Sequence, residues 1–163
     1  MALFAIGDLH LSSGASKPMD IFPGWGNHVA RLEGHWRRLI SPEDTVVLAG
    51  DISWAMRLED ALEDFAFIHS LPGQKLILKG NHDYWWTTAN KMNTFFASNG
   101  FDSLHLLHNN SYTVEGYAVC GTRSWLFEAG EPHDEKIMNR ELGRLRASLD
   151  AAGEGEKLVF LHY

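Results

Sequence analysis

The feature that most constrains this chain is a pattern that occurs four times: a short apolar run ends, and polar side chains able to bind a metal ion follow at once. Continuous apolar runs of this length predict buried strands. The runs span residues 2–6, 45–49, 75–79 and 157–161, and they are followed by Asp8 and His10, by Asp51, by Asn81, His82 and Asp83, and by His162. We therefore expect these side chains to lie at the ends of strands.

Segments with apolar residues at helical spacing separate the strands. The expected helices span residues 27–40, 58–70, 88–98 and 134–151. The order strand, helix, strand, helix, strand at the start of the chain is typical of parallel strands joined by crossover connections. The carboxyl ends of parallel strands share one rim of a sheet. The side chains expected to converge at that rim are Asp8, His10, Asp51, Asn81 and His82.

A different pattern between residues 104 and 121 predicts antiparallel structure. Residues 111–114 and 117–121 are two β-type runs around the dipeptide Glu115-Gly116, which is typical of a hairpin turn. They indicate either a second sheet or an edge added to the first. A short strand is also expected at 104–108.

Composition excludes several classes of function. The formal charge of −7 argues against broad, non-specific binding to nucleic acid, which requires a basic surface. The single cysteine, Cys120, allows no intrachain disulfide and favours the cytoplasm. The N-terminus lacks the basic segment of a signal peptide, and no apolar run is long enough to span a membrane. We expect one domain over residues 1–163, with no membrane partner and no sequence signature of an oligomeric state.

The residue types at the strand ends are those of a metal-dependent hydrolytic site, although each motif taken singly also fits a polar turn. Carboxylate, imidazole and amide oxygens together suit Mn²⁺, Fe²⁺ or Zn²⁺. Asp8 and His10 would project to the same face of an extended backbone and bind one ion. Asp51, from the middle strand, is the best candidate to bridge two ions, which can activate a water and clamp a phosphate ester. His82, with Asp83 to orient it, is placed to protonate the leaving oxygen.

Some side chains admit two interpretations. Arg123 can contact an anionic substrate or bridge to an acid, and the second interpretation is favoured. The tryptophans can include a stacking wall for a nucleobase, but packing of the loops over the sheet is the simpler interpretation. The tryptophans concerned are Trp25, Trp54, Trp85, Trp86 and Trp125.

Taken together, the motifs resemble those of the calcineurin-like metallophosphoesterase superfamily. The blocks that carry the resemblance are Asp8-x-His10, Gly50-Asp51, Gly80-Asn81-His82-Asp83 and the later strand-end His162. The local forms at 50–54 and 81–86 are similar to a subgroup of bacterial predicted phosphohydrolases. The resemblance implies an α/β fold, a layered α/β/β/α sandwich of two mixed sheets flanked by helices.

The resemblance also implies roles for the strand-end residues. Two divalent metal ions (Mn, Fe or Zn) are expected as cofactors. Asp8 and His10 would bind the first ion, Asp51 would bridge, and Asn81 and His162 would bind the second. His82 would assist the leaving group, with Asp83 behind it.

One departure from the family pattern affects these expectations. The pattern continues with a Gly-His-x-His block, which gives one more ligand to each metal, and these 163 residues contain no such block. We therefore expect the C-terminal part of the fold, with strands of the second sheet, to be missing, which would leave an edge or an apolar face uncovered. We also expect the chain end, one residue from His162, to fray. One ion at most should bind firmly, at Asp8, His10 and Asp51, and turnover should be slight.

Two functions from different classes follow. The first is a dinuclear phosphoesterase that hydrolyses a phosphomonoester or phosphodiester, of a small molecule or a nucleotide. The alternative is a non-catalytic, protein-binding scaffold on the same fold. Scaffolds tend to lose the strand-end ligands or the histidine of the Asn-His pair, and this chain has both.

Overall fold

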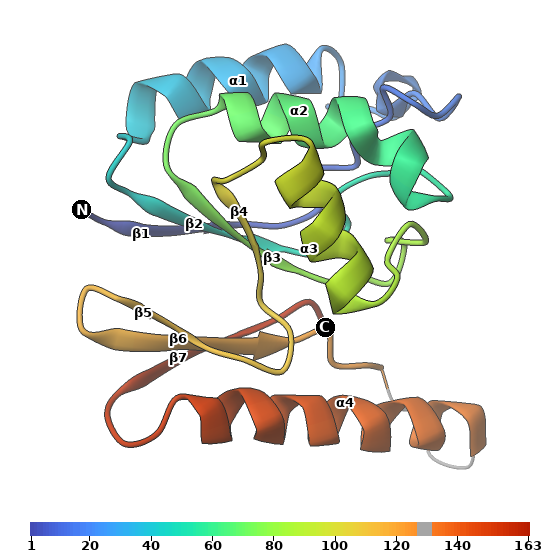
Figure 1. Cartoon of the computed structure of the whole chain (residues 1–163). Helices are drawn as coiled ribbons and strands as arrows, with labels where there is room; N and C mark the ends of the chain where they lie inside the picture. Colours follow the sequence, from blue (N-terminus) through green and yellow to red (C-terminus); the bar gives the residue numbers. More distant parts are fainter. Residues whose placement is uncertain (127–131) are drawn as a thin grey trace.

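The first layer of strands is a parallel sheet. The computed structural model describes residues 1–126 and 132–163. Within them, β1 (Leu3–Ile6), β2 (Thr45–Ala49), β3 (Gln74–Leu78) and β4 (Leu104–Leu106) pair in that order, all parallel (Figure 1). The predicted parallel arrangement is confirmed, and β2, which leads to Asp51, lies between β1 and β3.

Helices cover one face of this sheet. They are α1 (His28–Leu39), α2 (Leu62–Ser70) and α3 (Ala89–Ser98), with short 3-10 turns η1 (Met19–Ile21) and η2 (Leu58–Ala61) before α1 and α2 (Figure 1). Phe65 and Ile68 of α2 and Met92 of α3 are fully buried against the sheet. Side chains of this size each contribute about 1.5–3 kcal/mol when buried, so this layer fixes the positions of the strand ends.

A second sheet packs on the other face of the first. It contains β5 (Tyr112–Val114), β6 (Tyr117–Thr122) and β7 (Lys157–Leu161), and α4 (Pro132–Ala151) covers its outer side (Figure 1). β5 and β6 form the predicted hairpin, with left-handed φ angles of 51° at Glu115 and 83° at Gly116. β7 pairs parallel with β6. The layers are therefore helix, sheet, sheet, helix, as the α/β/β/α expectation requires.

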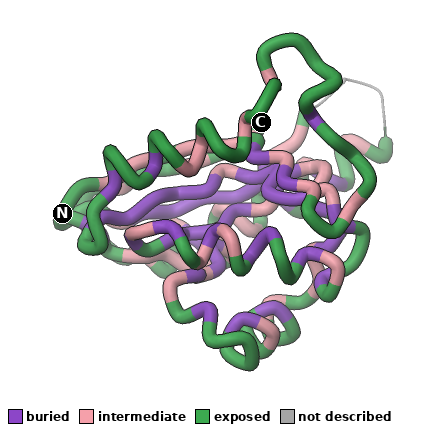
Figure 2. Tube along the Cα trace, turned by 90° about the horizontal axis from the view of Figure 1, so that it is seen from above, coloured by how far each residue is buried: buried purple, intermediate pink, exposed green. Residues whose placement is uncertain are grey.

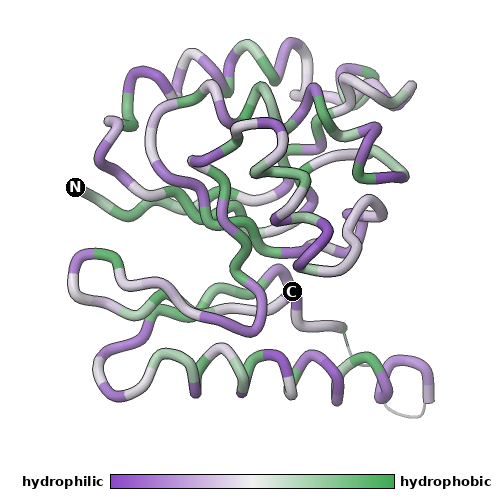
Figure 3. Tube along the Cα trace, viewed as in Figure 1, coloured by the Kyte–Doolittle hydropathy of each residue, from purple (hydrophilic) through white to green (hydrophobic). Residues whose placement is uncertain are grey.

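Burial and hydropathy follow these layers. Buried segments gather in the middle of the molecule (Figure 2), and the strands of the first sheet carry hydrophobic residues (Figure 3). Val47, Leu76 and Val119 fill the space between the sheets. β7 is less covered, because Val159 is 44% exposed and Leu161 43%. In the described residues, β7 lies at one edge of the second sheet.

Several buried charged residues were not foreseen from the sequence, among them Lys75 and Glu141. Lys75 in β3 has no exposed surface, and its ammonium group donates to the carbonyl oxygen of Leu71 and to Ser103 Oγ. Glu141 in α4 is 1% exposed and accepts from Thr122 Oγ1 at 2.7 Å and from Arg123 at 3.1 Å. The contact with Glu141 supports the acid-bridge interpretation of Arg123.

Candidate metal centre

The loops after β1 and β2 run side by side beyond the ends of their strands. Asp8 N donates to Gly50 O and His10 N to Asp51 O, each at 3.0 Å. These bonds extend the pairing of the two strands into the loops, so the side chains of Asp8 and His10 are brought next to Asp51. Two loops distant in sequence therefore build one half of the site.

The backbone of this half differs from the expectation. Asp8, His10 and Asp51 have φ angles of 57°, 45° and 53°, in the left-handed region that side chains disfavour. The prediction that Asp8 and His10 project from extended backbone is therefore wrong. The chain curls because both N–H groups turn toward carbonyls of the neighbouring loop. Left-handed non-glycine residues cost about 1–3 kcal/mol each and cluster at functional sites.

Two glycines let the loops approach. A Cβ on Gly80 would lie 2.1 Å from Asp51 Oδ1 and 2.2 Å from Asp51 N. A Cβ on Gly50 would lie 2.6 Å from His162 Nδ1 and 2.7 Å from the Cα of Gly80. Real Cβ atoms do not come this close to backbone, so only glycine allows the three loops to meet here.

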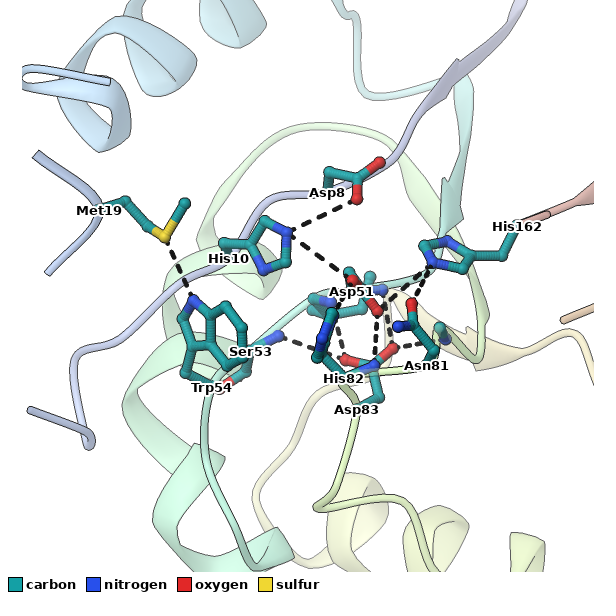
Figure 4. A network of polar contacts seen from close by, with 12 residues as sticks. Asp8, His10, Met19, Asp51, Ser53, Trp54, Asn81, His82, Asp83 and His162 are labelled. Carbon is teal, nitrogen blue, oxygen red and sulfur yellow. Dashed lines mark hydrogen bonds and ion pairs between the residues drawn. The ribbon is translucent and has the colours of Figure 1, made fainter. Parts of the chain in front are cut away.

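The carboxylate of Asp51 lies at the centre of the assembled side chains (Figure 4). Its Oδ2 is 2.8 Å from His82 Nδ1 and 3.7 Å from His10 Nε2. Its Oδ1 accepts from His82 N at 2.9 Å and lies 3.5 Å from His162 Nε2. The side chain is only 3% exposed. Three imidazoles from separate loops thus face one buried carboxylate.

The remaining candidate ligands border this centre on both sides. Asp8 Oδ1 lies 3.5 Å from His10 Nε2, and Asn81 Oδ1 lies 2.8 Å from His162 Nε2. The structure therefore brings together all five side chains expected to bind metal. Their individual roles stay predictions.

His162 is held more firmly than the sequence suggested. Its Nδ1 lies 2.8 Å from the carbonyl oxygen of Ala49, and its side chain is 7% exposed. The next residue is also tied down, because Tyr163 N donates to Arg123 O at 3.2 Å. The ring of His162 bonds to the end of β2 and to Asn81, one residue from the chain end that was expected to fray.

Asp83 has a different position from the one expected. Its carboxylate turns away from the imidazole of His82 and accepts N–H bonds from Gly80, Asp51 and Ile52 at 2.7 to 2.9 Å, and from the indole of Trp85 at 2.9 Å. The prediction that Asp83 orients His82 is wrong, because Asp51 occupies that place. Burial raises the pKa of Asp83, and its backbone donors oppose that shift. Asp83 instead fastens the loops that carry the candidate ligands.

Aromatic rings surround His10, which the sequence did not indicate. Trp54 stacks on His10 with ring centroids 4.9 Å apart. Trp25 meets His10 edge to face, with ring centroids 5.8 Å apart. Burial lowers the pKa of His10, despite the nearby carboxylates of Asp51 and Asp8. The neutral imidazole is the form that binds metal. The only signal in the sequence was the position of Trp54 just after Gly50-Asp51.

The donor set fits a divalent cation. Ligand atoms of Asp8, Asp51 and His162 all lie within 4.8 Å of one another. Two carboxylates supply negative charge, and imidazole and amide groups supply neutral donors, a mixture that suits Mn²⁺, Fe²⁺ or Zn²⁺. The contact of His162 Nδ1 with a backbone carbonyl leaves Nε2 toward the centre. Histidines that bind metals commonly make such a hydrogen bond with the other ring nitrogen.

Comparison with protein-family models decides the family. The model described as calcineurin-like phosphoesterase matches residues 1–162. The chain belongs to the calcineurin-like phosphoesterase family. The resemblance noted from the sequence motifs is thereby confirmed, and with it a family of metal-dependent phosphoester hydrolases.

Other comparisons add little about function. No curated protein sequence matches. Among solved structures, the chain is similar to the protein of unknown function AQ665 from Aquifex aeolicus, at 18% identity and a TM-score of 0.49, over 86% of this chain and 72% of that one. A likeness at this level carries no argument here. In the described residues, none of the helices is both long and apolar enough to cross a membrane.

Proposed function

We propose that this member of the calcineurin-like phosphoesterase family hydrolyses a phosphomonoester or phosphodiester with the help of two divalent metal ions. The observation that carries the proposal is the buried carboxylate of Asp51 with His10, His82 and His162 around it. Carboxylates so placed bridge two cations in hydrolytic sites. The single cysteine fits work in the cytoplasm, which stays a prediction.

The residues divide by position. Asp8 and His10 would hold one ion, Asn81 and His162 the other, and Asp51 would contact both. When bound, the two ions would lower the pKa of a water and neutralise the charge of the phosphoryl oxygens. Asp51 also fixes the ring of His82 through Nδ1, which leaves Nε2 to carry the proton given to the leaving oxygen.

The alternative of a non-catalytic scaffold on the same fold makes a different prediction. A scaffold has no need to pack five ligand-capable side chains around one buried carboxylate. It would also gain nothing from left-handed backbone at Asp8, His10 and Asp51. These costs favour catalysis.

The test is metal content followed by hydrolysis. The chain is loaded with Mn²⁺ and given an aryl phosphodiester, whose good leaving group makes the least demand on His82. Because these 163 residues contain no Gly-His-x-His block, we expect the Mn²⁺-dependent hydrolysis to be slight. It should fall at least about 100-fold in Asp51→Asn, while Asp102→Asn, a change of an exposed aspartate (92% exposed), leaves it unchanged. A protein that neither retains metal nor hydrolyses the ester would favour the scaffold.

A further inference from the structure

A groove of about 770 Å³ lies outside the candidate metal centre, between the start of η2 and the first turns of α3. Its volume is in the range that holds a drug-sized ligand. Aromatic side chains of Tyr84 and Trp86 line it, together with Lys91 and Arg57. None of these four side chains belongs to the candidate ligand set.

The groove adjoins the centre through one residue. Tyr84 lines the groove, and its ring meets that of His82 edge to face at 6.1 Å between centroids. The backbone joins them as well, because Tyr84 N donates to His82 O at 2.9 Å. The groove is therefore within reach of the leaving portion of a molecule whose ester is cut beside His82.

The lining combines exposed aromatic surface with charged side chains. Tyr84 is 50% exposed. Trp86 is partly exposed, and its ring also packs against the rings of Trp85 and His108, with centroids 5.4 and 5.5 Å away.

Lys91 is exposed, and Arg57 is held by Asp60 through two hydrogen bonds of 3.0 and 3.1 Å. Asp60 neutralises Arg57, and Glu59 balances Lys91, so the charges at the groove sum to zero among the described residues. Lys91 can pair with an anion, and the rings can stack on a flat group.

We propose that this groove binds the leaving nucleotide of a phosphodiester substrate. The base stacks on Trp86 and Tyr84, since every nucleobase has a face for stacking, and the nucleotide's own phosphate lies at Lys91. The inference rests on the proposed function, which places the leaving oxygen of the substrate beside His82. It adds the substrate class and assigns specificity to residues outside the metal centre. It also gives Trp86 the stacking role, while Trp25 and Trp54 pack on or near His10.

The test measures the binding of adenosine 5′-monophosphate to the metal-free protein by equilibrium dialysis. Omitting the metal separates the groove from the centre. We expect Trp86→Leu to weaken binding by about fivefold or more, because base–aromatic stacking is worth about 1–3 kcal/mol. We expect a loss of similar size, about fivefold or more, in Lys91→Met, because the phosphate loses its positive partner. Matched changes elsewhere, Tyr117→Leu and Lys136→Met, both at exposed positions, should leave it unchanged. Ribose 5-phosphate, which lacks the base, should bind at least about fivefold more weakly.

Each outcome separates the two proposals. If adenosine monophosphate and ribose 5-phosphate bind equally, or if Trp86→Leu binds like the wild type, the groove is not a nucleotide site, even when the aryl diester is hydrolysed. If the nucleotide binds as expected and no ester is hydrolysed, the groove inference holds and the proposed hydrolysis fails.

Discussion

At the scale of the residue, Asp83 shows that a side chain in a recognised motif can have a different role in the folded protein. Its place beside His82 in the sequence predicted a catalytic pair. In the structure, its carboxylate instead accepts hydrogen bonds from backbone N–H groups of the loops after β2 and β3. The direction of a side chain depends on loops that are distant in sequence, so no local pattern could reveal it.

Replacing Asp83 should therefore affect stability. In Asp83→Asn the amide group would face backbone N–H donors that then lack an acceptor, and the free energy of unfolding should fall by about 2–4 kcal/mol. Urea denaturation measures it. The exposed Asp102→Asn should stay within about 0.5 kcal/mol of wild type; an equal loss in both variants would contradict this role of Asp83.

Replacing His82 should affect turnover with little change in metal content. If its imidazole protonates the leaving oxygen, His82→Ala lowers turnover by about 10²–10⁴-fold, with a smaller loss on substrates that have good leaving groups. Rates on a series of aryl esters, with metal analysis of the same samples, provide the test. A variant that loses its metal would show that His82 is a ligand.

Lys75 gives a prediction on pH. Burial lowers the pKa of Lys75 to about 8 from an ordinary value of 10.5. Between these values the unfolded chain holds a proton that the folded chain has released, so stability rises with pH from about 8 to 10.5. We expect a rise of about 1–3 kcal/mol by denaturant unfolding, absent in Lys75→Met. Parallel curves for the two proteins across that range would refute it.

At the scale of the element, the strands were predictable and the shapes of their ends were not. Apolar runs located β1, β2, β3 and β7 to within about a residue. The expectation that all four are buried is right for β2 and β3. It is wrong for β1 and β7, whose residues are half-buried or exposed. The left-handed turns at Asp8 and Asp51 left no signal in the sequence, since bonds between neighbouring loops impose them. The buried Lys75 was equally hidden, because the groups that accept from it, Leu71 O and Ser103 Oγ, lie outside β3.

The approach of β2 and β3 at their ends predicts the effect of a single methyl group. Gly80→Ala would place a Cβ within 2.1 Å of Asp51 Oδ1, so the carboxylate must move. We expect Mn²⁺ affinity to fall by about tenfold or more, measured by equilibrium dialysis. Gly34→Ala, in α1 with no atom within 4 Å of the added carbon, is the matched control and should bind as wild type. Unchanged affinity in Gly80→Ala would show that the loops need not lie this close.

At the scale of the whole molecule, four strand ends supply one site because two sheets pack face to face. β1, β2 and β3 bring Asp8, His10, Asp51 and Asn81 to one rim, and β7 brings His162 there from the second sheet. The sequence indicated this convergence through its repeated order of elements. It did not indicate how firmly His162 is held, because its partner Ala49 lies 113 positions away.

The most direct test of the account is Mn²⁺ binding by wild type, Asp51→Asn and Asn81→Ala, each followed by dialysis and metal analysis. Asp51 would contact both ions, so Asp51→Asn should weaken all Mn²⁺ binding by about tenfold or more. Asn81→Ala should leave the firm ion at Asp8, His10 and Asp51 in place. If Asp51→Asn binds Mn²⁺ as tightly as the wild type, Asp51 is not the centre of a metal site, and the account of this protein as a metal-dependent phosphoesterase is wrong.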